Sequence, residues 1–169
     1  MKRLRLLAVL AATLLTPAGC GIYSFSGTSI QADVHTICIE PVVNKARTIN
    51  PSLANQITEA LNEKFRKLTR LEQVQEEGDL NLTVTIEDYR VAATAITADE
   101  VAAMNRLTVT CKVVFVNNKH TEDNIDGQQF AAYEDYDSNN PLDMVEARLC
   151  DAIVDKLVED IFNSAVAQW

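Results

Sequence analysis

Residues 80–87, Leu-Asn-Leu-Thr-Val-Thr-Ile-Glu, decide the fold because apolar and polar side chains alternate along them. This period of two places the four aliphatic side chains on one face of a β-strand and leaves Asn, Thr and Glu on the other face. The strand is predicted to reach about Val91. It indicates a sheet with one buried face and one polar face.

Further strand patterns lie on both sides of this segment. Residues 107–115 repeat the alternation, and residues 128–136 follow a turn at Asn124–Gly127. Upstream, residues 71–75 and 35–43 are also predicted strands. The chain therefore supplies four or five strands to the sheet.

Two helices are predicted, each beginning at an Asn-Pro pair. Asn50 is the expected cap with Pro51 at the first helical position, and Asn140 and Pro141 repeat this arrangement. Apolar residues recur at fourfold spacing in the first helix and form a wide stripe in the second. The order β-α-β-β-β-β-α predicts an α+β fold: a two-layer α/β sandwich, with a four- or five-stranded mixed sheet and two helices on one face.

The sheet face opposite the helices is predicted to be polar with little charge, which suits contact with a polar partner surface. Its residues are Asn81, Thr83, Thr85, Thr108, Thr110 and Lys112. Residues 91–105, between two long strands, are small and apolar, unlike a solvated loop. Three outcomes are open for them: they extend the hairpin as a projecting tip, insert into a partner, or fold as a short helix that closes the core.

The formal charge of the chain is −9, which excludes a nucleic-acid binder driven by attraction to phosphate. Residues 121–169 carry 12 acidic and two basic residues, whereas residues 20–120 carry 12 acidic and 10 basic ones. Arg90, Arg106 and Lys112 lie on or beside the central strands. They are candidate ligand-binding residues for phosphates or acids, and the alternative is that they are scattered, solvated charges.

The N-terminal residues are organised as a secretion signal. A basic start is followed by a ten-residue apolar run, Leu6–Leu15, well short of the roughly 20 residues that span a bilayer. Small residues precede Cys20, as at the acylation site of a bacterial lipoprotein, although Pro17 stands where an aliphatic residue is usual. The alternative is an ordinary secretion signal with Cys20 unmodified.

The predicted domain organisation follows from this start. Residues 1–19 form a signal peptide, residues 20–34 a lipidated N-terminal tether, and residues 35–169 a single α/β domain. Loss of three basic residues with the signal peptide takes the charge from −9 to −12. Acylation of Cys20 would hold the chain on a membrane. Gly21, rather than an acid, follows the cysteine, a pattern that resembles an outer-membrane destination, with the body on the periplasmic face.

Catalytic chemistry has little support in the sequence. His35 and His120 belong to no known catalytic or metal motif. Cys38, Cys111 and Cys150 are expected to be buried free thiols, and if one pair forms a disulfide, Cys38 with Cys111 is favoured because both lie in predicted strands. We therefore predict that the chain is not an enzyme and holds no cofactor beyond the covalent lipid.

One segment has the spacing of a calcium loop. Counted from Asp135, oxygen-bearing side chains fall at positions one, three, five, nine and twelve, and the candidate ligands are Asp135, Asp137, Asn139 and Glu146. Position six is Asn140 rather than the Gly of an EF-hand, and the incoming segment is a predicted strand rather than a helix. The alternative is that this segment caps the last helix and complements its dipole.

Four segments of the chain are typical of one known family. They are Cys20–Ile30 directly after the signal peptide, Asn105–Val109 at the start of a strand, Tyr133–Ser138, and Val158–Asn163 with the terminal Trp169. In these segments the sequence resembles the LPS-assembly lipoprotein family, LptE type, of Gram-negative outer membranes. The resemblance covers nearly all of the mature chain. Cys20 alone carries over residue by residue, as the acylation site.

The resemblance implies a membrane-anchored lipoprotein with a two-layer α/β fold and no enzymatic activity. Such a protein sits as a plug inside the large outer-membrane β-barrel LptD, helps it assemble and assists lipopolysaccharide transport to the cell surface. Direct binding of lipopolysaccharide through basic residues is a further property of the family, and the resemblance assigns it to no particular residue of this chain. The alternative function is a calcium-binding periplasmic envelope module without a barrel partner.

Overall fold

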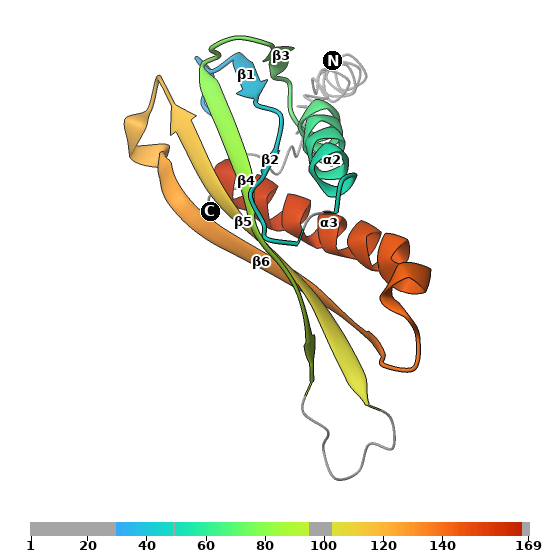
Figure 1. Cartoon of the computed structure of the whole chain (residues 1–169). Coiled ribbons are helices and arrows are strands. Elements are labelled where there is room, and N and C mark those ends of the chain that lie inside the picture. The colour runs from blue at the N-terminus through green and yellow to red at the C-terminus, as the bar shows by residue number, and fades with distance from the viewer. Residues whose placement is uncertain (1–29, 49, 95–102, 167–169) are drawn as a thin grey trace, which may run out of the picture.

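A computed structural model describes residues 30–48, 50–94 and 103–166 of the chain (Figure 1). The predicted signal peptide, Cys20 and most of the predicted tether lie outside these residues. The elements follow in the order β1 (Thr36–Ile39), β2 (Val43–Asn44), α2 (Leu53–Leu68), β3 (Glu72–Val74), β4 (Leu80–Ala93), β5 (Met104–Asn117), a 3₁₀ turn η1 (Thr121–Asp123), β6 (Ile125–Asp137) and α3 (Leu142–Val166).

The sheet is mixed and open, with the strand order β3-β1-β4-β5-β6 and β2 paired with β4. β1 runs parallel to β3 and β4, whereas β4, β5 and β6 form an antiparallel meander. The segment predicted as one strand, residues 35–43, is divided into β1 and β2. Pro41 lies in the gap, and the Val42 N–H donates to the Thr58 hydroxyl of α2 at 3.0 Å instead of to β4, which interrupts the ladder. The predicted α+β sandwich is confirmed, with six strands when β2 is included.

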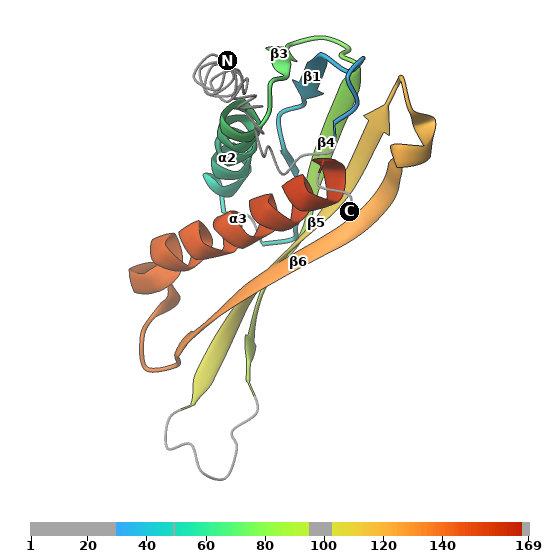
Figure 2. The same ribbon diagram turned by 180° about the vertical axis from the view of Figure 1, so that it is seen from behind.

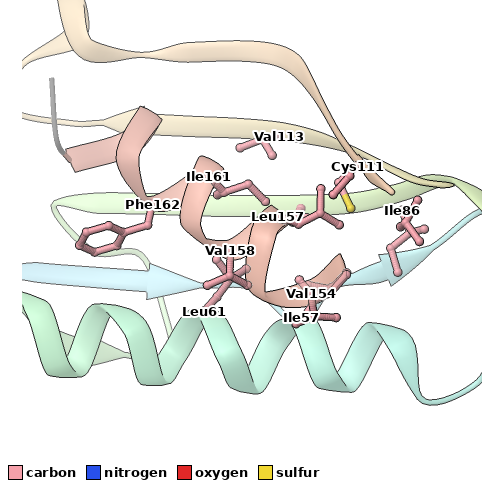
Figure 3. Packing of buried hydrophobic residues seen from close by; sticks show 14 of the residues in the cluster. Ile57, Leu61, Ile86, Cys111, Val113, Val154, Leu157, Val158, Ile161 and Phe162 are labelled. Atoms are coloured by element: carbon pink, nitrogen blue, oxygen red, sulfur yellow. The ribbon is translucent and has the colours of Figure 1, made fainter. Parts of the chain in front are cut away.

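The core lies between one face of the sheet and the two helices, as Figure 2 shows for α3. Figure 3 shows side chains of α2, α3 and the central strands meeting in one cluster. The apolar residues of α2 at fourfold spacing are all fully buried: Leu53, Ile57, Leu61 and Phe65. Phe65 also packs edge-on against Phe162 of α3, with 5.0 Å between ring centroids. The predicted amphipathic packing of both helices is thus confirmed.

The predicted starts of both helices and of the last strand were wrong by one to three residues. Ser52, not Asn50, is the cap residue of α2, because the Asn50 side chain accepts a hydrogen bond from the Ser52 N–H and forms a turn before the helix. α3 begins at Leu142, so Pro141 precedes its first residue. β6 begins at Ile125 rather than after the Asn124–Gly127 turn, because Gly127 adopts a φ of 71° and makes a bulge within the strand.

The β4–β5 hairpin projects beyond both helices (Figures 1 and 2). Ala93 pairs with Asn105, and the Thr94 N–H donates to the Met104 carbonyl, so the described part of residues 91–105 extends the hairpin. Residues 95–102 lie outside the described part of the chain. Among the described residues, no helix is both long and apolar enough to cross a bilayer.

Candidate functional site

The meander β4–β5–β6 presents a continuous face that neither described helix covers, which we call the open face. Side chains directly opposite one another in an antiparallel ladder lie on the same side of the sheet. The register therefore defines rows across this face: Thr85–Lys112–Gln129, Asp88–Thr110–Ala131, Arg90–Thr108–Tyr133 and Ala92–Arg106–Asp135. The Thr residues predicted for a polar face all lie on it.

The structure brings the three candidate basic residues, Arg90, Arg106 and Lys112, onto the open face. Arg90 and Arg106 are diagonal neighbours, since Arg90 lies opposite Thr108, two positions from Arg106. A β-bulge between Ile86 and Asp88 makes this possible. It shifts the alternation by one residue, so that Tyr89 turns to the core and Arg90 turns outward.

Arg106 is held in place by two neighbours on β6. Its Nε and one terminal nitrogen donate to the two Asp135 carboxylate oxygens at 2.7 and 2.8 Å, and its guanidinium carbon lies 3.7 Å from the centroid of the Tyr133 ring. The hydrogen bonds raise the pKa of Arg106 and lower that of Asp135. Asp135 thus offsets the charge of Arg106, and this part of the open face carries little net charge.

Tyr133 is a residue of this site that the sequence analysis did not single out. Its spacing of two from Asp135 would have placed both side chains on one face of β6. The β5–β6 register, however, is needed to bring them against Arg106.

The other two basic residues are less constrained. The side chain of Arg90 is 66% exposed, and its Nε lies 3.9 Å from Asp88. Lys112 extends across the bulge, because a Cβ added to Gly127 would lie 2.7 Å from Lys112 Cε. Gly127 therefore provides both the backbone conformation of the bulge and the space for this lysine. The open face is polar, and its charges of both signs lie close to one another.

The candidate calcium ligands have other partners in the structure. Asp135 binds Arg106, Asp137 accepts hydrogen bonds from the backbone and side chain of Asn139, and Glu146 binds Tyr89 and Asn50. The described residues include no group of three or more His, Cys, Asp or Glu side chains placed to hold a metal ion. Calcium binding stays a prediction without geometric support, and calorimetry at millimolar calcium decides it.

The contacts of Glu146 form a small polar network at the edge of the core. The hydroxyl of buried Tyr89 donates to Glu146 Oε1, and Asn50 Nδ2 donates to the same oxygen at 3.1 Å. Burial and this carboxylate raise the pKa of Tyr89 well above its usual range. The network joins β4, the start of α2 and the first turns of α3, so we interpret it as structural.

The described thiols lie in the core. Cys38, Cys111 and Cys150 are buried and free, as predicted, and the conditional Cys38–Cys111 disulfide is not formed. Burial raises the pKa of Cys111 to about 12, and it also raises the pKa of Cys38 and of Cys150. All three therefore stay protonated at neutral pH, which makes them poor nucleophiles.

His120 and Asp123 bind the segment that enters the domain, and we call these contacts the clasp. Its Nε2 lies 3.0 Å from Asp33 Oδ1, and the neighbouring Gln31 side chain donates to Asp123 at 2.6 Å. Val34, the residue after Asp33, is buried. Residues 30–34 are thereby fixed against the turn that follows β5.

We expect this clasp to loosen as the pH rises. The hydrogen bond to Asp33 raises the pKa of His120 and lowers that of Asp33. Because the pKa of His120 is raised in the folded protein, its contribution to stability is complete below the unfolded-state pKa of the histidine. This contribution is lost as pH rises through the folded-state pKa. Asp33 loses its contribution only as pH falls through its own lowered pKa. The ion pair is thus formed at pH values between the folded-state pKa of Asp33 and the folded-state pKa of His120.

NMR titration of the His120 ring measures this coupling. The imidazole should titrate at a lower pH in Asp33→Asn than in the unmodified chain, and exchange of the Val34 amide with solvent should become faster as His120 loses its proton. Identical His120 titration curves in the two proteins would contradict the clasp.

Comparison with solved structures finds similar folds. Uncharacterized lipoprotein B from Nitrosomonas europaea is 8% identical with a TM-score of 0.51, over 78% of this chain and 85% of that one. A hypothetical protein from Chlamydia trachomatis is 9% identical with a TM-score of 0.50, over 80% and 99%. A minor lipoprotein from Acinetobacter baumannii is 14% identical with a TM-score of 0.45, over 76% and 89%. At these identities the likeness concerns the fold alone.

Comparison of the sequence identifies the family. None of the curated proteins compared with it matches the chain. A family model described as LptE, lipopolysaccharide-assembly, matches residues 34–165. This match spans most of the chain and includes the whole sheet and both helices except the last residue of α3. The chain therefore belongs to the LptE lipopolysaccharide-assembly family, a non-enzymatic lipoprotein family of the bacterial envelope.

Proposed function

We propose that this protein is an outer-membrane lipoprotein that binds and plugs an LptD-type β-barrel, assists assembly of the barrel and supports lipopolysaccharide transport to the cell surface. An acyl anchor at Cys20, after removal of residues 1–19, holds it at the periplasmic face of the membrane. Residues 20–34 serve as the tether and residues 35–169 as the domain that enters the barrel. Membership of the lipopolysaccharide-assembly family supports this role.

The observation that carries the proposal is the open face of the meander. The lumen of a large outer-membrane barrel is polar, so a protein that binds inside it needs a polar surface. Charged side chains on that surface must be paired, because burying an unpaired charge in the interface is costly. Rows of Thr residues beside the Arg106–Asp135 pair provide such a surface. The β4–β5 hairpin lengthens it beyond the helices (Figure 1).

Crosslinking in living cells tests this orientation. A photo-crosslinking amino acid at Thr108 or Thr110, on the open face, should capture a large β-barrel protein in good yield. The same amino acid at Glu59, exposed on α2, serves as the control. Failure to capture a barrel from either Thr position removes the proposal, and equal yields from Glu59 remove the assignment to the open face.

The same experiment reports on lipopolysaccharide. Arg90 and Lys112 are exposed on the open face, so a crosslinker placed between them at Thr110 also lies within reach of an anionic lipid there. Crosslinked lipopolysaccharide would add the lipid as a direct ligand, and a barrel without lipid would limit the role to binding the barrel.

A further inference from the structure

β6 is a long strand at one edge of the sheet. It has 13 residues and pairs with β5, while its other side pairs with no strand among the described residues. Exposed edges of this kind present backbone donors and acceptors that can pair with another chain. Many proteins use such an edge to bind an extended peptide as an added strand.

The hydrogen-bond pattern identifies which backbone groups face outward. The Ser138 N–H donates to the Ala103 carbonyl, which makes the even-numbered residues of β6 the ones that bond to β5. The N–H and C=O groups of odd-numbered residues, among them Ala131 and Tyr133, therefore point away from the sheet. Lys156 Nζ donates to the Tyr133 carbonyl at 3.2 Å, as this geometry requires.

A groove of about 510 Å³ lies along this edge, between β6 and α3. Ala131, Ala132 and Tyr133 form its strand side, and the small alanine side chains leave room beside the backbone. Its helix side carries three acids and one base: Asp155, Glu159, Asp160 and Lys156. The groove thus combines outward backbone groups with excess negative charge.

We propose that this groove binds an extended basic segment of a partner protein, which adds to the sheet as a strand beside β6. Side chains of an added strand alternate between its two faces, so every second residue would lie toward α3. Lys or Arg at these positions would meet Asp155 and Asp160. Lys156 Nζ donates both to the outward Tyr133 carbonyl at 3.2 Å and to Glu134 Oε1 at 2.6 Å, so a backbone N–H of the added strand replaces it at the carbonyl while the ion pair with Glu134 is kept.

Charge argues against a second copy of this chain as the occupant. Edge-to-edge pairing of two β6 strands would bring the acids of both α3 helices into one interface, and like charges held close together oppose association. A basic segment gains from the same acids. The inference does not depend on the barrel as partner, since any protein with such a segment meets its requirements.

Peptide binding to the chain purified from bacterial membranes tests the proposal. The probe is a synthetic decapeptide with Lys and Val in alternation, and its control is the same peptide N-methylated at alternate residues, which keeps the charge but cannot form a ladder. Calorimetry should show binding of the first peptide only. Hydrogen exchange should show that the Ala131 and Tyr133 amides become protected when it binds.

Two variants test whether the acidic residues of the groove contribute to peptide binding. Asp155→Lys with Asp160→Lys should weaken binding of the basic peptide at least about tenfold, the effect of roughly 1.4 kcal/mol. Glu59→Lys, a charge reversal on the exposed side of α2, should leave it unchanged.

The proposal is overturned by equal binding of the N-methylated peptide, by absence of binding at millimolar peptide, or by peptide binding without protection of the two amides. It is also overturned if the chain self-associates with these amides protected. A barrel recovered by crosslinking has no bearing on these outcomes, so the two proposals can fail separately.

Discussion

Replacement of Phe65 by Ala is expected to lower the free energy of unfolding by about 3–5 kcal/mol. The Phe65 side chain is fully buried where α2 meets α3, and its ring packs edge-on against Phe162. The substitution removes buried apolar surface and leaves a cavity that two packed helices cannot readily close. Such a loss is a large share of the 5–15 kcal/mol that stabilises a typical domain. Urea denaturation followed by circular dichroism measures it.

The control lies one turn later on the same helix. Leu68 is 47% exposed, so Leu68→Ala should change the free energy of unfolding by no more than about 0.5–1 kcal/mol. The comparison isolates burial, because both changes leave Ala, the best helix former, in place. Equal losses in the two variants would show that the contact between the helices contributes little to stability.

The helices and the sheet could be predicted from the sequence because burial on one side leaves a periodic pattern. Fourfold spacing of apolar residues along α2 and alternation along residues 80–86 each reflect contact with one core. The same alternation predicted a polar second face, and β4 and β5 place its Thr residues there. Both predictions required only the geometry of a single element.

The position of Arg90 could not be predicted in this way. A strict alternation continued from Ile86 would turn Arg90 toward the core, and only the bulge before Asp88 turns it outward. The Arg106–Asp135 pair joins residues 29 apart, and the Tyr89–Glu146 hydrogen bond joins residues 57 apart. Such contacts depend on strand register and on the placement of helices, neither of which leaves a periodic signal in one sequence.

The residues proposed as calcium ligands have the spacing of a calcium loop, but the structure uses them for other contacts. The carboxylate spacing after Asp135 is real, but β6 ends within it and α3 begins within it. Asp135 lies on the open face and binds Arg106, whereas Glu146 lies on α3 and binds Tyr89. A calcium loop needs its ligands to turn around one point, and here the chain crosses from a strand to a helix.

Replacement of Cys20 by Ala is expected to move the fraction of the protein that is not bound to a barrel from the outer membrane into the soluble periplasm. On the proposed function the acyl chains at this residue are the anchor, and each buried CH₂ contributes about 0.8 kcal/mol to membrane binding. Electrostatic attraction offers no substitute, because the chain without its first nineteen residues carries a charge of −12 and anionic lipids repel it. Fractionation of washed membranes and labelling with radioactive palmitate measure the two effects.

Residues 1–19 need a control of their own, because the Leu6–Leu15 run of an uncleaved precursor could itself hold the chain on the inner membrane. We therefore expect the clearest release when residues 1–19 are replaced by an ordinary cleavable secretion signal in the Cys20→Ala variant. The hairpin and open face stay intact in that protein, so any residual membrane fraction measures binding to the barrel alone. Palmitate labelling that persists without Cys20, or an unmodified chain that is soluble and unlabelled, would contradict the anchor.

When the barrel is present, a larger share of the released domain should bind to the membrane as the amount of barrel rises. Binding to the barrel follows mass action, whereas an acyl anchor holds the chain on the membrane without the barrel.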